Sequence, residues 1–267
     1  MTSLLSRIAV AAAGLPIVLF AAYYGGWALL LIAALGALFA LHELYRLARS
    51  LRPLVLAGYG GALAAVIGAS LGGPEWMLGG LMLTLLLALV FAAVSETRQS
   101  TTVAVAVTVL GTAWIGLGLG HLVLLRDVEP DGRLALITVL LAVFVADTFA
   151  YAAGRLAGRH RMAPAISPGK TWEGFVAGLA FGILTTWFAT YDQEVFADSW
   201  RPFAFGAVVV LAGVAGDLFE SMVKRDLGAK DSGRALLGHG GVLDRIDSLL
   251  FAGPAAYYVF VVLSPGS

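Results

Sequence analysis

Residues 134–154 read LALITVLLAVFVADTFAYAAG and contain one charged side chain, that of Asp147. At a rise of 1.5 Å per residue, an α-helix of this length crosses a hydrocarbon core of about 30 Å. Similar apolar stretches recur along the whole chain of 267 residues, of which 60% are hydrophobic and 13% are charged. A soluble domain carries about 25% charged residues. The composition therefore excludes a water-soluble globule and predicts an all-α polytopic membrane protein.

The hydropathy pattern predicts about nine transmembrane helices. The first begins just after Arg7 and resembles the apolar part of a signal peptide. Because its apolar run is long and another span follows at once, we expect it to be retained. The nine predicted spans are 8–24, 27–44, 54–71, 76–94, 102–125, 134–154, 173–191, 203–222 and 246–263.

The placement of lysine and arginine predicts the orientation of these spans. With the N-terminus in the cytoplasm, inside segments hold 14 of the 17 basic residues and outside loops hold 3. This bias follows the positive-inside rule, so we expect a cytoplasmic N-terminus and an external C-terminus. Residues 1–130 are predicted to form an N-terminal transmembrane scaffold. Residues 131–267 are predicted to form a catalytic region with two cytoplasmic motif loops, 155–172 and 223–245.

Charge and cysteine content exclude several classes of function. The formal net charge is zero, without a basic tail or an acidic block, so no nucleic-acid partner is expected. The chain has no cysteine, which excludes thiol nucleophiles and cysteine-ligated zinc or iron–sulfur clusters.

Acidic residues within predicted spans are the first candidates for a functional site. A charge near the bilayer centre costs about 2.5–3.5 kcal/mol, so such residues face a wet cavity or a partner. Asp147 precedes Arg155 by eight residues and Asp217 precedes Lys224 by seven. Both carboxylates are thus expected roughly 10–12 Å below the cytoplasmic rim, where they can share one polar site. A structural ion pair is the alternative for Asp147.

Residues 217–248 read DLFESMVKRDLGAKDSGRALLGHGGVLDRIDS. Asp217, Glu220, Ser221 and Lys224 follow the i, i+3, i+4, i+7 spacing of one helix face, and Asp244 and Asp247 are three residues apart. Carboxylates on two helix ends with cations between them suit a divalent metal bound to a polyphosphate. The alternative is a juxtamembrane loop whose acids balance its basic residues. The basic candidates between the two helix ends are Lys224, Arg225, Lys230, Arg234 and His239.

Residues 160–174 read HRMAPAISPGKTWEG. A nucleoside-triphosphatase P-loop is excluded, because Pro164 stands where that motif requires a glycine and no strand precedes it. Thr171 is a candidate N-cap for the next span, with Glu173 in its first turn. Capping does not explain Lys170, since a cation is disfavoured at a helix N-terminus. Lys170 is therefore predicted to meet an anion.

At these residues the chain resembles the phosphatidate cytidylyltransferase (CDP-diacylglycerol synthase) family. The signature of that family runs S-x-x-K-R, four residues, K-D, and later H-G-G-x-x-D-R-x-D. Upstream, the residues around Asp147 and the stretch 167–174, SPGKTWEG, also look like the family's. The signature matches Ser221, Lys224, Arg225, Lys230, Asp231, His239, Gly240, Gly241, Asp244, Arg245 and Asp247.

The resemblance implies that the cytidylyl group of CTP is transferred to phosphatidic acid, which yields CDP-diacylglycerol and pyrophosphate. It implies Mg²⁺ held by Asp217, Asp244 and Asp247, and leaves open an accompanying monovalent cation such as K⁺. It implies phosphate contacts for Lys170, Lys224, Arg225 and Lys230. His239 either donates to a phosphate or shapes its turn. Further candidates for contacts to substrate are Asp147, Ser167, Thr171, Ser221, Asp231 and Arg245.

Two other functions remain open at this point. One is a related CTP-dependent kinase or cytidylyltransferase that acts on an isoprenoid lipid, because acyl tails leave little polar signature. The other is an ion-coupled transporter, although the acids gather at the cytoplasmic ends of the spans. The implied setting is a bacterial cytoplasmic membrane with the active site facing the cytoplasm. Whether the protein works as a homodimer is also open.

Overall fold

A computed structural model describes residues 14–94, 100–196, 198, 200–230, 232–233 and 241–263. The chain divides into two compact units. The N-terminal unit comprises Met1–Leu124 and Leu227–Ile246, and the C-terminal unit comprises Leu125–Asp226 and Asp247–Ser267. The segment after α8 thus belongs to the same unit as the first helices. The predicted division of roles between residues 1–130 and 131–267 stays a prediction.

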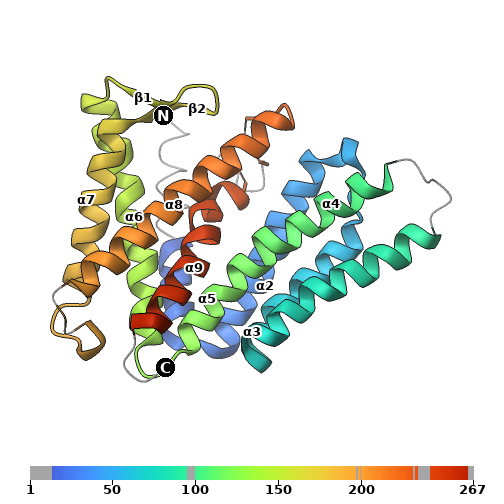
Figure 1. Ribbon diagram of the computed structural model, residues 1–267, viewed down its shortest axis with the longest axis horizontal. Coiled ribbons are helices and arrows are strands. Elements are labelled where there is room, and N and C mark those ends of the chain that lie inside the picture. The colour runs from blue at the N-terminus through green and yellow to red at the C-terminus, as the bar shows by residue number, and fades with distance from the viewer. Residues whose placement is uncertain are drawn as a thin grey trace. The chain divides into compact units, whose positions relative to one another are not determined.

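Helices dominate both units, and one short β-hairpin interrupts them (Figure 1). A helix at Gly14–Tyr24 precedes α2. The elements are α2 (Gly26–Leu47), η1 (Arg49–Leu51), α3 (Val55–Val94), α4 (Thr101–Gly111), η2 (Thr112–Gly116), α5 (Leu117–Asp127), α6 (Gly132–Ala157), β1 (Arg161–Ala163), β2 (Ser167–Thr171), α7 (Trp172–Ala189), η3 (Glu194–Phe196), α8 (Arg201–Asp226) and α9 (Leu243–Leu263).

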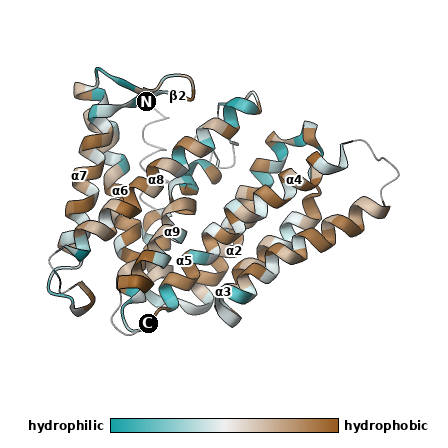
Figure 2. Ribbon diagram, in the orientation of Figure 1, coloured by the Kyte–Doolittle hydropathy of each residue, from teal (hydrophilic) through white to brown (hydrophobic). Residues whose placement is uncertain are grey.

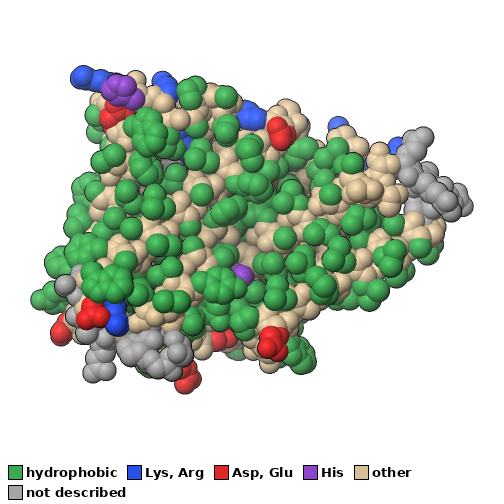
Figure 3. Space-filling model, viewed as in Figure 1, with side chains coloured by type: hydrophobic (Ala, Val, Ile, Leu, Met, Phe, Trp, Pro, Cys, Tyr) green, Lys and Arg blue, Asp and Glu red, His purple; other side chains and the backbone are tan. Residues whose placement is uncertain are grey.

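Seven helices in the described part of the chain are long and apolar enough to cross a membrane. Hydrophobic residues run along most of their length (Figure 2) and cover most of the face in Figure 3. Large apolar side chains such as Trp27 and Phe188 are 79% and 78% exposed, as expected of a surface that meets lipid. The protein is an integral membrane protein, as predicted. The count of nine spans and the sides on which the termini lie stay predictions.

Helix α3 contains 40 residues, about twice the length that a membrane requires. It is interrupted at Gly72 and Gly73, which are non-helical, and Gly73 has a φ of 72° that favours glycine. A Cβ on Gly68 would lie 2.5 Å from the carbonyl oxygen of Trp76, so the two halves of α3 pack closely against each other. The halves coincide with the predicted spans 54–71 and 76–94.

Buried hydroxyl groups link the helices of the N-terminal unit. The Tyr45 hydroxyl of α2 donates to the carbonyl oxygen of Thr108 in α4 at 2.9 Å. The Thr84 hydroxyl of α3 donates to that of Thr112 in η2 at 3.2 Å. Hydrogen bonds between helices matter in a membrane because lipid offers a hydroxyl no partner.

Small residues bring α6 and α7 together in the C-terminal unit, where the two helices lie side by side (Figure 1). A Cβ on Gly174 would lie 2.6 Å from the carbonyl oxygen of Ala150, and one on Gly178 would lie 2.8 Å from that of Ala146. Gly182 continues this spacing of four residues along α7 and faces Ala146 as well. Close approach of this kind is how membrane helices gain packing energy without a hydrophobic driving force.

The connection between α6 and α7 is an antiparallel hairpin of β1 and β2, with Arg161 opposite Thr171 and Ala163 opposite Ser167. Where the sequence analysis expected a cytoplasmic loop, 155–172, without strands, the chain forms two short strands joined by a turn. Residues 164–166 form that turn, and the strands on either side add pairing that the sequence did not reveal. Because β2 leads directly into α7, the hairpin sets the start of that helix.

Adding one methyl group at Gly178 should destabilise the protein. Gly178→Ala places a Cβ against the α6 backbone, and overpacking of this kind costs about 1–3 kcal/mol. Gly79→Ala is the matched control, since nothing lies within 4 Å of a Cβ at that exposed helical position. We expect a lower midpoint of thermal unfolding in detergent for Gly178→Ala and an unchanged or higher midpoint for Gly79→Ala. Equal midpoints would contradict the packing described for α6 and α7.

Candidate functional site

Helices α8 and α9 approach each other closely beside two of the predicted site residues. A Cβ on Gly216 would lie 2.5 Å from the carbonyl oxygen of Asp247. This contact brings the neighbouring Asp217 to the part of α9 that carries Asp247, whose side chain is within electrostatic reach of those of Asp217 and Glu220. Because Gly216 lets α8 and α9 touch, the carboxylates of Asp217 and Asp247, which are far apart in the sequence, belong to one group.

Two lysines neutralise part of this group. Lys170, at the end of β2, forms an ion pair with Asp217, with 2.8 Å between Nζ and Oδ2. Lys224 forms an ion pair with Glu220 one turn earlier on α8, with 2.6 Å between Nζ and Oε2. In the structure Lys170 is thus neutralised by a carboxylate of α8, and its predicted contact with a phosphate stays a prediction.

Electrostatic contacts extend the group to Asp147 of α6, which interacts with both Asp217 and Lys170. Four carboxylates thus accompany two ammonium groups, so the cluster has an excess of negative charge when all of them are ionised. Glu220 and Asp247 are buried, with 2% and 8% of their surface exposed. Hereafter "the acidic cluster" means Asp147, Lys170, Asp217, Glu220, Lys224 and Asp247.

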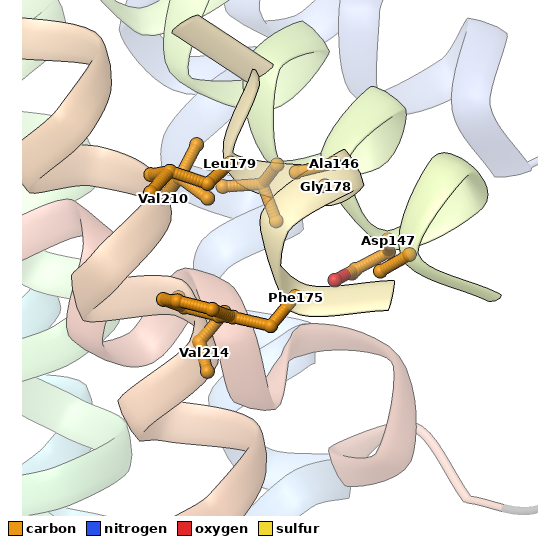
Figure 4. Close-up of a pocket in the computed structure, with 10 residues that line it drawn as sticks. Ala146, Asp147, Phe175, Gly178, Leu179, Val210 and Val214 are labelled. Carbon is orange, nitrogen blue, oxygen red and sulfur yellow. The ribbon is translucent and has the colours of Figure 1, made fainter. Parts of the chain in front are cut away.

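A cavity of about 20 Å³ lies beside Asp147, between α6, α7 and α8. Ten residues line it, and Asp147 is the charged one among them. Figure 4 shows the Asp147 side chain near Phe175, with Leu179 and Val210 farther from it. A volume of this size holds about one water molecule. The Asp147 side chain itself is exposed at the protein surface.

The β-hairpin contributes backbone groups and a helix cap. The Thr171 hydroxyl accepts a hydrogen bond from the backbone N–H of Gly174 at 3.1 Å, which is the geometry of an N-cap. The capping alternative for Thr171 is therefore confirmed. Arg225 of α8 donates through Nε to the carbonyl oxygen of Ile166 at 3.2 Å. This bond ties the C-terminal end of α8 to the hairpin, next to Ser167.

Glu173 is the other capping candidate, and it contacts a different element. Its carboxylate lies 2.6 Å from Nδ1 of His160 and also accepts from the His160 backbone N–H. Glu173 thus links His160, the residue before β1, to the first turn of α7. A negative charge is favoured in that turn.

The remaining predicted site residues belong mostly to the N-terminal unit. The Asp244 carboxylate accepts from the backbone N–H of Gly241 at 2.7 Å and from that of Ser232 at 3.1 Å. Lys230 and Arg245 are exposed, while Ser221, in the C-terminal unit, is partly buried. Asp231 and His239 lie outside the described residues. Their predicted roles stay predictions.

The described residues contain no group of three acidic or histidine side chains arranged to hold a metal ion by themselves. Magnesium needs fewer, since it is usually bound by one or two carboxylates and completes its octahedron with phosphate oxygens and water. Asp217 and Asp247 supply two carboxylates of the required chemistry within a cluster of excess negative charge. The donor set therefore fits a magnesium ion that is bound together with a phosphate substrate.

The sequence analysis missed one buried acid that contacts the motif loop 223–245, hereafter called the motif segment. Glu43 of α2 is 4% exposed, and it accepts hydrogen bonds from Ser232, Val242 and Leu243. It lies inside the predicted span 27–44, so the rule that singled out Asp147 and Asp217 applied equally to it. Its partners are about 190–200 residues away in the sequence, and no local pattern relates them.

Comparison with known proteins identifies the family. The sequence model of the cytidylyltransferase family matches residues 5–263. The chain belongs to this family. The resemblance indicated by the motifs is thereby confirmed, and the match extends over nearly the whole chain.

Relatives in two bacterial genera carry the same name, phosphatidate cytidylyltransferase. The one from Staphylococcus epidermidis is 36% identical over 235 residues, which are 86% of this chain and 88% of the relative. The one from Staphylococcus haemolyticus is 35% identical over 247 residues, or 90% and 91% of the two chains. The one from Mycobacterium bovis is 36% identical over 246 residues, or 87% and 80%.

Loss of the Thr171 hydroxyl should destabilise the protein. Thr171→Ala removes the acceptor for the first turn of α7 and should cost about 0.5–2 kcal/mol, seen as a lower midpoint of thermal unfolding. Thr171→Ser keeps the acceptor and should retain most of the stability. The matched control is Thr185→Ala on the same helix, whose hydroxyl bonds back to the carbonyl oxygen of Phe181 within α7. If the Thr171 and Thr185 alanine variants unfold at the same temperature, the cap is not stabilising.

Proposed function

We propose that this protein transfers the cytidylyl group of CTP to phosphatidic acid and releases CDP-diacylglycerol and pyrophosphate. Two findings support the proposal together. The chain belongs to the cytidylyltransferase family over residues 5–263, and its motif residues form a cluster of carboxylates and lysines in a membrane protein. The observation that carries the proposal is the Lys170–Asp217 ion pair. It joins the two separate stretches of motif residues, 160–174 and 217–248, in one site.

The reaction requires that the lipid phosphate and CTP be aligned and their negative charges neutralised, and it depends less on proton transfer. An oxygen of the lipid phosphate attacks the α-phosphorus of CTP, and the bond from that phosphorus to the bridging oxygen of the β-phosphate breaks. Because the attacking oxygen is already anionic, no strong general base is needed. Holding the two anions in line and screening their charges then accounts for most of the rate enhancement.

The residues of the acidic cluster suit these tasks. In the structure the Lys170 and Lys224 ammonium groups each lie beside a carboxylate, and phosphate oxygens can share them. Arg225, held near the hairpin by Ile166, adds a third cation. Asp147, at the cavity between α6, α7 and α8, is proposed to position substrate.

We propose that Asp217 and Asp247 hold Mg²⁺, with Asp244 as a third ligand three residues before Asp247 on α9. When bound, the ion would neutralise phosphate charge and stabilise the leaving pyrophosphate. The excess negative charge of the acidic cluster supports this assignment. An accompanying monovalent cation is left open.

We also propose a bacterial cytoplasmic membrane as the location, with the acidic cluster open to the cytoplasm, where CTP is available. The bacterial relatives support the location. The 14-to-3 distribution of basic residues between the predicted sides supports the orientation.

Labelled CTP tests the proposed reaction. Purified protein in detergent micelles with phosphatidic acid, Mg²⁺ and CTP labelled at the α-phosphate should transfer label to the organic phase. CTP labelled at the γ-phosphate should leave its label in the aqueous phase as pyrophosphate. Transfer of γ-label would identify a kinase. A parallel reaction replaces phosphatidic acid with an isoprenoid phosphate, and transfer of α-label only in that reaction would identify a different lipid substrate. No transfer in either reaction would contradict the proposal.

Removing one carboxylate of the cluster should abolish most of the turnover. Asp247→Asn deletes a charged ligand worth on the order of 3 kcal/mol in the transition state, which corresponds to about a hundredfold or more in rate. The matched control is Asp192→Asn, an exposed position outside the cluster. We expect near-normal rates for the control at every magnesium concentration. Near-normal activity of Asp247→Asn at limiting magnesium would exclude Asp247 as a ligand.

A further inference from the structure

Glu43 is a buried carboxylate in the N-terminal unit that the reaction itself does not use. It lies near the C-terminal end of α2, one turn before Leu47, and 4% of its surface is exposed. A carboxylate in such a place persists only when hydrogen-bond donors replace its lost hydration. The identity of these donors shows what the residue does.

Among the described residues, the hydrogen-bond donors to Glu43 come from the motif segment and from its junction with α9. The Ser232 hydroxyl donates to Oε2 at 3.1 Å. The backbone N–H of Val242 donates to Oε1 and that of Leu243 to Oε2, both at 2.9 Å. Leu243 is the first residue of α9, so Glu43 satisfies backbone groups that a helix start leaves without intrahelical partners. A negative charge at that end is also favoured by the helix dipole.

Two glycines of the motif segment make room for this carboxylate. A Cβ on Gly233 would lie 2.7 Å from Oε1 of Glu43. A Cβ on Gly241 would overlap Oε2. Glycines at both positions therefore let the two ends of the segment close around one side chain of α2.

Asp244 holds the same two ends from within α9. Its carboxylate accepts from the backbone N–H of Ser232 at 3.1 Å and from that of Gly241 at 2.7 Å. Glu43 and Asp244 thus share the residues that they hold, one carboxylate coming from α2 and the other from the first turn of α9. A change in one of them alters the surroundings of the other.

We propose that Glu43 is a positioning residue that fixes the N-terminal turn of α9 and, through it, the side chains of Asp244 and Asp247. The inference rests on the proposed function, which assigns those two aspartates to magnesium. The bonds from Glu43 determine where α9 begins, and the helix then carries the two carboxylates at a spacing of three residues. Groups that orient metal ligands in this way typically change metal affinity or activity by about 10–100-fold when they are removed.

The test compares Glu43→Gln with Glu75→Gln, an equivalent change at an exposed position of α3. An amide keeps one acceptor oxygen and turns an N–H₂ group toward the backbone donors of Val242 or Leu243. For Glu43→Gln we expect the magnesium concentration at half-maximal rate to rise by about tenfold or more. Glu43→Asp should recover part of the loss because the charge is kept. If Glu43 serves stability alone, the rate per folded molecule and its magnesium dependence will match those of Glu75→Gln.

A second readout does not depend on activity. Hydrogen–deuterium exchange of a peptide covering residues 241–250 should be faster in Glu43→Gln than in the wild type, while peptides of α7 should be unchanged. If Glu43→Gln does not fold, Ser232→Ala removes one donor only and should show the same two effects to a smaller extent. A wild type that transfers no cytidylyl group contradicts the proposed function. Unchanged exchange and unchanged magnesium dependence in an active Glu43 variant contradict this inference.

Discussion

A carboxylate inside an apolar helix must find donors or cations, and this requirement organises both units of the protein. Asp217 and Glu220 each pair with a lysine, and Glu43 takes two backbone N–H groups and a hydroxyl. Each of these bonds joins or orders segments that the apolar packing alone would leave unrelated. Because lipid offers these polar groups no alternative partner, they determine which parts of the chain meet.

Close helix packing supplies the geometry that those polar contacts need. Glycines in α7 bring it against α6, and Gly216 brings α8 against α9 at Asp247. A larger side chain at any of these positions would overlap atoms of the neighbouring helix, so the helices would have to move apart. Structure and site are therefore coupled, because the contacts that stabilise the helix pairs are also those that place the acids and the lysines near one another.

The helices could be predicted from hydropathy because a membrane span needs a long apolar run, a property that is local in the sequence. The proximity of Asp147 and Asp217 was also foreseeable, since the two acids have matching predicted depths. Two features could not be predicted from the sequence in this way. The strands of the hairpin are too short for a periodic pattern, and the role of Glu43 depends on partners that only tertiary structure supplies. The acid itself was detectable as a charge in a span, and applying that rule to every span would have found it.

The hydrogen bonds of Glu43 also have a consequence for biogenesis. Leu243 follows Glu43 by 200 residues, and a chain grows at about 5–20 residues per second, so roughly 10–40 s of synthesis separate the carboxylate from its donors. During that time α2 is already made, and its acid, one helical turn from the end at Leu47, can reach water or lipid headgroups at the membrane surface. The motif segment and α2 can join only after the donors at residues 232–243 have been synthesised. Assembly of this part of the protein is thus a late step, and the rate of chain synthesis sets its earliest time.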